Sequence, residues 1–158
     1  MLDNKKILIT GIANKFSIAN GIAQSMSNNG AELAFAYQNE RLLKKIKPIA
    51  DDLGVKTLIE CDVACDKSIE QTFSQLADEW GTLDGIVHSI GFAPSDQLDG
   101  DFTEVTTREG FQIAHDISSY SFTALAKGAL PILSEKAALL TLTYLGSIQS
   151  LPNYNVMG

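Results

Sequence analysis

The chain has 158 residues, of which 45% are hydrophobic, so its size and composition are typical of one globular domain. Its net charge of −7 argues against nucleic acid or an anionic membrane as the main partner, because both require a basic face. No apolar run approaches the ~20 residues of a membrane helix, and Met1–Lys6 lead directly into a strand without a signal-peptide pattern. We therefore expect a cytoplasmic protein.

A glycine loop joins the first predicted strand, Lys5–Thr10, to a helix that starts at Ser17 and runs to about Asn28. The free N–H groups and the dipole of a helix start favour an anion, so this loop predicts a phosphate site. Gly11 permits the sharp turn after the strand. The later glycines of the usual G-x-G-x-x-G fingerprint are missing, so the loop alone leaves an ordinary strand–helix turn equally open.

The end of this helix and its packing are also predicted. Asn28-Asn29-Gly30 form a left-handed stop. Within the helix, the small residues Ala19 and Gly21 predict close packing against the first strand.

Two further strands alternate with two helices along the next part of the chain. A short strand over Glu32–Tyr37 precedes a lysine-rich helix from Asn39 to Leu53-Gly54, which Pro48 is expected to disturb midway. The next strand covers Thr57–Asp62. It is followed by a helix that opens at Asp66 and stops at Gly81.

The remaining elements include an unusually long connection. The strand Leu83–Ile90 has the apolar run of an element buried on both sides, and the loop Gly91 to about Thr106 is long enough to indicate a function. A long helix from Thr107 to about Leu133 has apolar residues on more than one stripe. A last apolar strand, Ala137–Thr143, leads into a loop, Tyr144–Gly158, that begins another helix.

This alternation predicts an α/β fold with a doubly wound parallel sheet of strand order 3-2-1-4-5. Ligands of such sheets bind at the carboxyl ends of the strands. The loops that follow the strands are therefore expected to form one site, and they contain Gly11–Ile18, Gln38, Asp62-Val63, Ile90–Ala93 and Tyr144 onwards.

Three polar residues near strand ends suit a dinucleotide. Asp62 can accept a hydrogen bond from an adenine amino group while Val63 covers the ring, although Asp62 capping a turn is an alternative. Gln38 stands where an acid often binds the ribose hydroxyls, and its neutral side chain does not decide between NAD and NADP. Arg41 could reach a 2′-phosphate, but solvated surface is the stronger expectation.

Two tyrosines flank the last loop. A phenol is protonated at neutral pH and suits the donation of a hydrogen bond to an oxygen that gains negative charge, which makes Tyr144 and Tyr154 candidate catalytic residues. Core packing is an equal alternative for Tyr144.

The histidines and cysteines do not predict a metal site. His88 and His115 have no metal-ligand spacing and are expected to be structural. Cys61 and Cys65 form no second pair, so we expect buried free thiols rather than a disulfide or a zinc site.

Several segments resemble the bacterial NADH-dependent enoyl-[acyl-carrier-protein] reductases, a divergent branch of the short-chain dehydrogenase/reductases. The matching motifs extend over the whole chain and are Gly11-x5-Ser17-x-Ala19, Cys61-Asp62-Val63, His88-Ser89-Ile90-Gly91-Phe92-Ala93-Pro94, Thr107-Arg108-Glu109-Gly110-Phe111, Ala114-His115-Asp116-Ile117-Ser118 and Tyr154-Asn155-Val156-Met157-Gly158. That branch replaces the later glycines of the loop with the Ser17-x-Ala19 pattern, which accounts for the incomplete fingerprint.

The resemblance implies that NADH reduces the trans-2 double bond of an enoyl thioester carried by acyl-carrier protein, in fatty-acid elongation. Tyr154 would donate a hydrogen bond to the enolate oxygen, and Tyr144 would line the acyl pocket. Ala93 would contact the substrate through its backbone. The cofactor contacts implied by the resemblance are Gly11, Ser17, Ile18, Gln38, Asp62, Val63 and Ile90.

One spacing separates the two reductase classes. Carbonyl-reducing members of the superfamily carry Tyr-x-x-x-Lys, whereas Gly158 stands four positions after Tyr154. The enoyl reductases carry Tyr-x-x-Met, which matches Met157, and place their lysine seven positions after the tyrosine, the third position beyond Gly158. We therefore expect residues 1–158 to be the N-terminal portion of a single Rossmann-like domain whose C-terminal part is missing.

The resemblance further implies a homotetramer, and the two-sided long helix agrees with that expectation, although an internal core helix would show the same pattern. A carbonyl (3-oxoacyl) reductase and a non-catalytic nucleotide-binding protein are the alternative functions.

Overall fold

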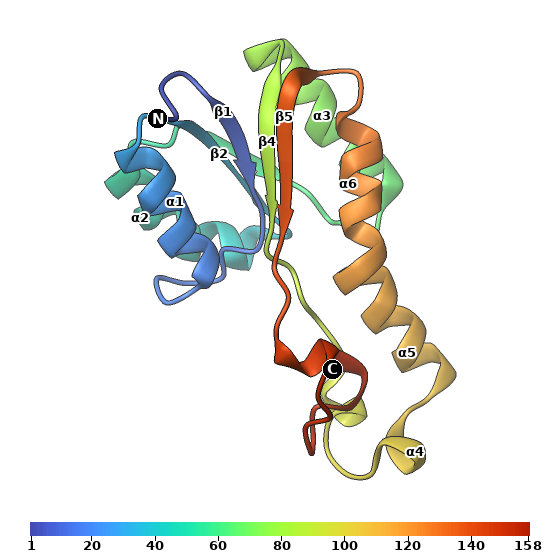
Figure 1. Cartoon of the computed structure of the whole chain (residues 1–158). Helices are drawn as coiled ribbons and strands as arrows, with labels where there is room; N and C mark the ends of the chain where they lie inside the picture. Colours follow the sequence, from blue (N-terminus) through green and yellow to red (C-terminus); the bar gives the residue numbers. More distant parts are fainter.

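Five parallel strands form the centre of the molecule in the order β3-β2-β1-β4-β5, as predicted (Figure 1). The computed structural model describes residues 1–158. The strands are β1 (Lys6–Ile9), β2 (Glu32–Tyr37), β3 (Thr57–Glu60), β4 (Leu83–His88) and β5 (Leu133–Thr141). The carboxyl ends of all five strands therefore lie at the same edge of the sheet, the lower edge in Figure 1.

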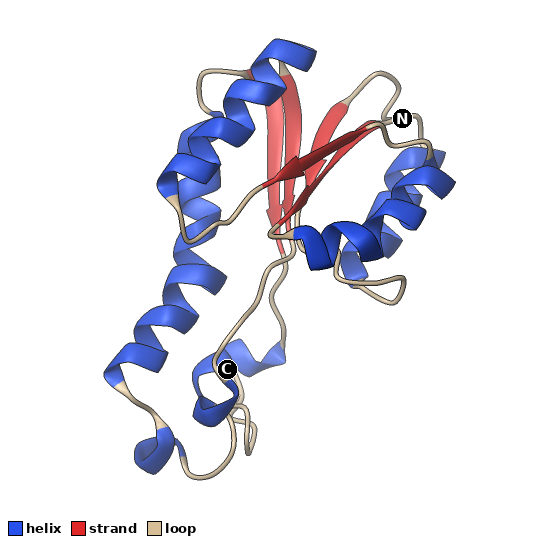
Figure 2. Cartoon of the chain, turned by 180° about the vertical axis from the view of Figure 1, so that it is seen from behind, coloured by secondary structure: helices blue, strands red, loops and turns tan.

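Helices cover both faces of the sheet (Figure 2). The helices are α1 (Ile18–Asn28), α2 (Glu40–Leu53), α3 (Asp66–Trp80), α4 (Phe102–Val105), α5 (Arg108–His115) and α6 (Ser121–Ala129), and a π-turn (Asp116–Tyr120) joins α5 to α6. Short 3-10 turns occur at Ser95–Gln97, Leu145–Ser147 and Asn155–Met157. No helix is long and apolar enough to cross a membrane.

Alternate residues of each strand enter two separate cores. Ile7 and Ile9 of β1 pack with α1 and α2, whereas Leu8 between them packs with α3 and α6. Neighbouring strands alternate in the same way, so both faces of the central strands are buried. Full burial of each such aliphatic side chain contributes about 1.5–3 kcal/mol, so the two cores together stabilise the sheet.

Helix α2 differs from the expectation that Pro48 disturbs it. The helix is continuous from its N-cap, where the Asn39 side chain accepts a hydrogen bond from the Leu42 N–H, to Gly54 with φ +68°. Pro48 is exposed while Ile46 and Ala50 are fully buried. We attribute the unbroken helix to this apolar anchoring on both sides of the proline, which offsets the missing hydrogen bond.

The predicted boundary between the last helix and the last strand was wrong. Helix α6 ends at Ala129, and β5 already begins at Leu133 because it pairs with Leu83 of β4. Pro131 favours the break, since proline does not continue a helix. Every residue of β5 is partly or fully exposed despite its apolar sequence, because the strand lies at the edge of the sheet.

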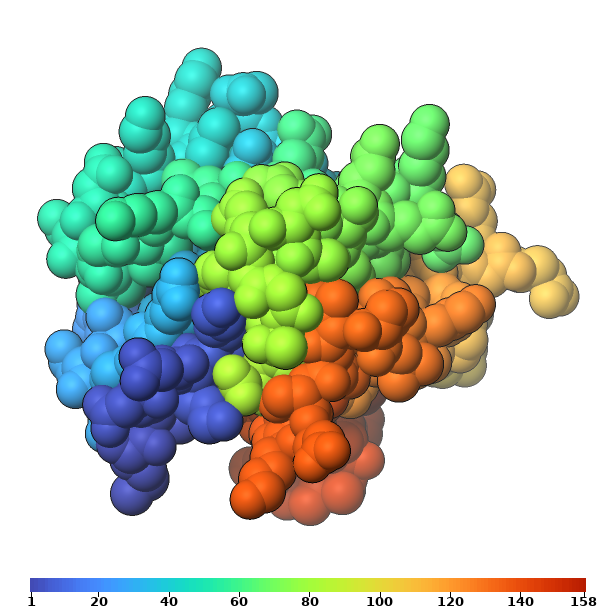
Figure 3. Space-filling view, turned by 90° about the horizontal axis from the view of Figure 1, so that it is seen from above, coloured from blue at the N-terminus to red at the C-terminus, as the bar shows by residue number.

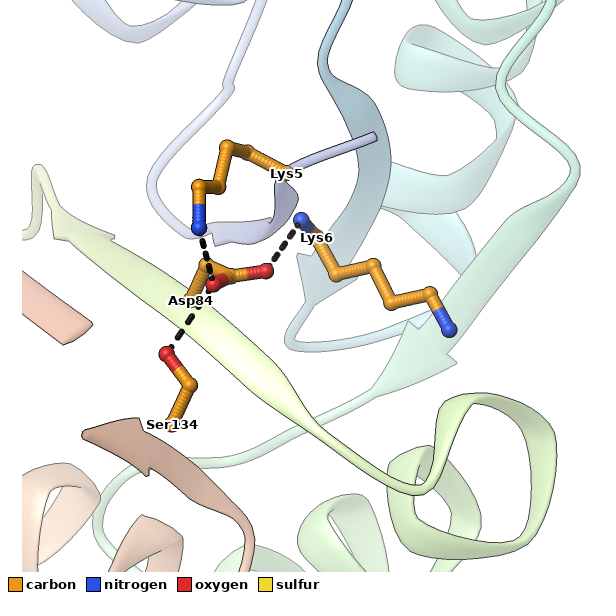
Figure 4. A network of polar contacts seen from close by, with 4 residues as sticks. All are labelled: Lys5, Lys6, Asp84 and Ser134. Atoms are coloured by element: carbon orange, nitrogen blue, oxygen red, sulfur yellow. Dashed lines mark hydrogen bonds and ion pairs between the residues drawn. The ribbon is translucent and has the colours of Figure 1, made fainter. Parts of the chain in front are cut away.

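At the N-terminal edge of the sheet, one carboxylate, that of Asp84, makes hydrogen bonds to three other residues (Figure 4). Asp84 accepts hydrogen bonds from Lys5 Nζ at 2.8 Å, from the Lys6 backbone N–H at 3.1 Å and from Ser134 Oγ at 2.9 Å. These contacts, led by the Lys5 ammonium, lower the pKa of Asp84 below its usual value. Figure 3, which views this edge, shows the starts of β1, β4 and β5 side by side.

Candidate active site

A cavity of about 430 Å³ opens at the carboxyl edge of the sheet. Its wall comes from the residues that follow β1, β2, β3 and β4, which the parallel topology brings together. Five of the predicted residues line it, namely Gly11, Gln38, Asp62, Val63 and Ile90. We call it the glycine-loop cavity.

Gly11 is the residue at which the chain turns out of β1. Its φ is +80°, and a Cβ built there would overlap the carbonyl oxygen of Ser89. Beside it, Thr10 Oγ1 donates to the Val87 carbonyl at 3.1 Å and accepts from the Ser89 N–H at 3.4 Å. The turn after β1 and the end of β4 are therefore in backbone contact, and only glycine fits there.

Ser17 is the N-cap residue of α1, as predicted, but its hydroxyl does not cap the helix. Ser17 Oγ accepts from the Ala13 and Asn14 N–H groups at 3.0 and 3.1 Å and so holds the glycine loop closed. The first helical N–H groups, those of Ile18 and Ala19, have no acceptor within the helix. The N–H of the exposed Ile18 is therefore available to an anion, whereas Ala19 is fully buried.

The packing prediction for α1 was half right. Ala19 is fully buried against the sheet, whereas Gly21 is exposed and has no atom near the position of a Cβ. Gly21 lies on the solvent side of the helix, so the close approach depends on Ala19.

Asp62 caps a turn, the alternative considered from the sequence, and its contact with an adenine stays a prediction. Its Oδ1 accepts from the Ala64 N–H at 3.2 Å, which caps the turn after β3, and the residue also lines the glycine-loop cavity beside Val63. Gln38 is exposed at the end of β2, and Arg41 is exposed on α2 with no ion pair.

The cysteine expectation was correct for Cys61 only. Cys61 is a buried free thiol, and burial raises the pKa of that thiol. Cys65 is free but exposed, because it occupies the N-cap position of α3.

A second cavity, of about 740 Å³, lies beyond the end of β5 and is called the tyrosine cavity here. Tyr144 and Tyr154 both line it, with ring centroids 5.0 Å apart in an edge-on arrangement. Desolvation, together with the neighbouring Tyr154 phenol, raises the pKa of Tyr144, so this phenol stays protonated at neutral pH. Ile18 also lines this cavity, so the start of α1 reaches it.

The two cavities share a wall. Ser89, Ile90 and Gly91, which follow β4, line both of them. A ligand that extends across this wall would contact the glycine loop at one end and the tyrosine pair at the other. Ala93 and Ser17 line neither cavity, so their contacts with ligands remain predictions.

Gly91 and Phe92, within the predicted segment Ile90–Ala93, line the glycine-loop cavity. The structure adds wall residues that the sequence did not place in the site, among them Ser89, Ile117 and Ser118. Ser89 follows β4 and could have been found by the rule for strand ends. Ile117 and Ser118 lie in the π-turn, which no sequence pattern predicted.

His88 is structural, as predicted, whereas His115, for which the same was predicted, lines the tyrosine cavity. The buried ring of His88 lies 2.7 Å from Ser121 Oγ and 2.9 Å from Thr141 Oγ1, and burial lowers its pKa. His115 is exposed and stacks on Phe111 with ring centroids 4.1 Å apart. No group of three potential metal ligands occurs in the chain.

Comparison with known proteins gives consistent matches. A family model described as Enoyl-(Acyl carrier protein) reductase matches residues 11–158. Enoyl-[acyl-carrier-protein] reductase [NADH] FabI of Escherichia coli (strain K12) is 57% identical over 157 residues, which cover 99% of this chain and 60% of that protein. The corresponding enzyme of Enterococcus faecalis is 46% identical, with 99% of this chain and 62% of that protein covered. The chain thus spans about 60% of the length of these curated relatives.

Solved structures agree with the sequence matches. The enoyl-[acyl-carrier-protein] reductase (NADH) of Aquifex aeolicus VF5 superposes with a TM-score of 0.95 at 44% identity, over 99% of this chain and 62% of that one. The reductase of Anaplasma phagocytophilum, solved in complex with NAD, has a TM-score of 0.95 at 40% identity, over 99% of this chain and 60% of that one.

Proposed function

Because this chain belongs to the enoyl-(acyl carrier protein) reductase family, we propose that residues 1–158 are the N-terminal portion of a single dinucleotide-binding domain in an NADH-dependent enoyl-thioester reductase. The observation that carries the proposal is the wall Ser89–Gly91, which lies between the glycine-loop cavity and the tyrosine cavity. A nicotinamide beside this wall would face the tyrosine pair.

The two adjoining cavities together fit a dinucleotide. The unpaired N–H of the exposed Ile18, at the start of α1 beside the tyrosine cavity, suits a phosphate, and Gly11 removes the side chain that would separate the loop from β4. Asp62 and Val63 suit an adenine, and Gln38 suits a ribose. When bound, NADH supplies the hydride for the β-carbon of the enoyl thioester.

The tyrosine cavity fits the acyl half of the reaction. Hydride addition to a trans-2-enoyl thioester places negative charge on the thioester oxygen, and a phenol O–H stabilises that charge by donating a hydrogen bond. Tyr154 supplies this bond in our proposal. Tyr144, held protonated beside it, lines the acyl pocket, and the Ala93 backbone contacts the substrate.

The wider setting is also part of the proposal. The proposed substrate is carried by acyl-carrier protein, as the names of the related enzymes state for them. A cytoplasmic homotetramer is proposed for the whole protein, supported by the exposed aromatic side chains of Phe111 and Tyr120 on the long helix.

The test follows NADH oxidation by the full-length polypeptide with a crotonyl thioester and with an acetoacetyl thioester. We expect turnover of the crotonyl thioester. Turnover of the acetoacetyl thioester alone would favour the carbonyl-reductase alternative, and NADH binding without turnover of either would favour a non-catalytic protein.

A further inference from the structure

The long helix that borders both cavities is irregular at one place. Between α5 and α6 the backbone forms the π-turn Asp116–Tyr120, which holds more residues per turn than an α-helix. Three successive residues of this turn line cavities, Ile117 in the glycine-loop cavity and Ser118 and Ser119 in the tyrosine cavity. Single π-turns within helices are rare and often lie at functional sites, so a functional role is expected for the side chains of this turn.

Ser118 makes two hydrogen bonds to one distant residue. Its Oγ accepts from the Phe92 backbone N–H at 2.9 Å and donates to the Phe92 carbonyl oxygen at 2.9 Å. Phe92 follows the shared wall Ser89–Gly91, and its side chain is exposed. One hydroxyl therefore satisfies both polar backbone groups of a loop residue that has no strand partner.

These two bonds orient the peptide units on either side of Phe92. Each peptide unit is planar and trans, so its N–H and its carbonyl point in opposite directions. With the Phe92 N–H directed at Ser118, the Gly91 carbonyl points away from Ser118. With the Phe92 carbonyl directed at Ser118, the Ala93 N–H also points away from it. Ser118 thereby sets the direction of two backbone groups beside the shared wall.

A second serine anchors the π-turn to the sheet. Ser121 Oγ donates to the Ile117 carbonyl at 2.6 Å, and His88 Nε2 of β4 lies 2.7 Å from the same oxygen. Since the hydroxyl proton of Ser121 is already donated, His88 Nε2 carries the proton of the neutral ring, and Nδ1 accepts from Thr141 Oγ1 at 2.9 Å. The π-turn is thus connected through His88 to the rigid centre of the fold.

We propose that Ser118 is a positioning residue whose hydroxyl fixes the backbone of Gly91–Ala93 and so sets the fit of the acyl substrate. The effect on substrate rests on the proposed function, whereas the effect on the backbone does not. Ser118 acts through Phe92 rather than on the reacting atoms.

The experiment replaces Ser118 in the full-length polypeptide by alanine and by threonine, which keeps the hydroxyl. In Ser118→Ala we expect amide hydrogen exchange at Phe92, measured without ligand, to accelerate at least fivefold, because the N–H loses its acceptor. The KM for a crotonyl thioester should rise about tenfold, while kcat changes less than about threefold. Ser118→Thr should restore both values.

The matched control is Thr123→Ala, which removes an exposed hydroxyl from α6 that lines neither cavity. It should leave exchange at Phe92, KM and kcat unchanged. Unchanged exchange in Ser118→Ala would overturn the proposal, as would a fall in kcat and melting temperature with KM unaltered. If exchange responds but the wild-type protein reduces no enoyl thioester, the backbone role is supported and the proposed function fails.

Discussion

Polar groups are paired with one another at the N-terminal edge of the sheet and left partly unpaired at its carboxyl edge. At the N-terminal edge, the Asp84 carboxylate takes hydrogen bonds from Lys5, Lys6 and Ser134, so the charges there satisfy one another. At the carboxyl edge, the N–H of the exposed Ile18 has no partner within the helix, and the oxygens of Asp62 accept only from its own turn. The first arrangement stabilises the sheet, and the second leaves groups available to a ligand.

The largest expected effect is at the carboxyl edge and concerns the tyrosine pair. Tyr154→Phe removes the proposed hydrogen bond to the enolate oxygen, so kcat of the full-length polypeptide should fall about 10²–10³-fold, which corresponds to about 3–4 kcal/mol. The measurement is NADH oxidation with a crotonyl thioester. Tyr144→Phe serves as the control and should reduce kcat less than about tenfold. A full rate in Tyr154→Phe would remove Tyr154 from the mechanism.

The glycine loop gives the next largest effect. Gly11→Ala places a Cβ on the Ser89 carbonyl oxygen at φ +80°, so it should destabilise the fold by about 2–3 kcal/mol and abolish measurable NADH binding. Urea unfolding and fluorescence titration with NADH measure the two effects. Gly21→Ala, on the exposed side of α1, should instead stabilise by about 0.5–1 kcal/mol. Equal behaviour of the two variants would contradict the role of Gly11.

A smaller effect is expected at Asp62. Asp62→Asn retains an oxygen that can accept from the Ala64 N–H, so the turn after β3 should persist and stability should change by less than about 0.5 kcal/mol. The dissociation constant for NADH should rise about three- to tenfold, because a charged acceptor for the adenine amino group is lost. Calorimetric titration measures this change. A loss of stability with unaltered affinity would leave Asp62 with the capping role alone.

The smallest effect is expected at the N-terminal edge, and it depends on pH. Asp84→Asn should destabilise the fold by about 1 kcal/mol at pH 7 and leave NADH affinity unchanged. The pKa of Asp84 is lowered in the folded state, so the carboxylate stabilises the fold above the unfolded pKa of about 4, and this contribution is lost as pH falls through the lower folded value. Urea unfolding at pH 7 and at pH 3 should therefore show the difference between wild type and variant shrinking on acidification. A pH-independent difference would contradict the ionic origin.

The sequence was sufficient to determine the fold class, the strand order and the positions that follow strands. Apolar β-branched runs separated by helical patterns admit few arrangements other than a doubly wound sheet, and the topology then places Gly11, Gln38, Asp62 and Ile90 at one edge. These inferences depend on local periodicity and on general rules of connection, which a sequence contains.

Only the tertiary structure decided where one element ends and what each polar group contacts. The long helix stops at Ala129 because β5 pairs with β4 from Leu133, and that pairing joins residues far apart in the chain. The π-turn at Asp116–Tyr120 and the contact of Ser118 with Phe92 likewise require the loop after β4 and the long helix to lie side by side. Such contacts arise from packing between distant segments, so no local pattern of residues can contain them.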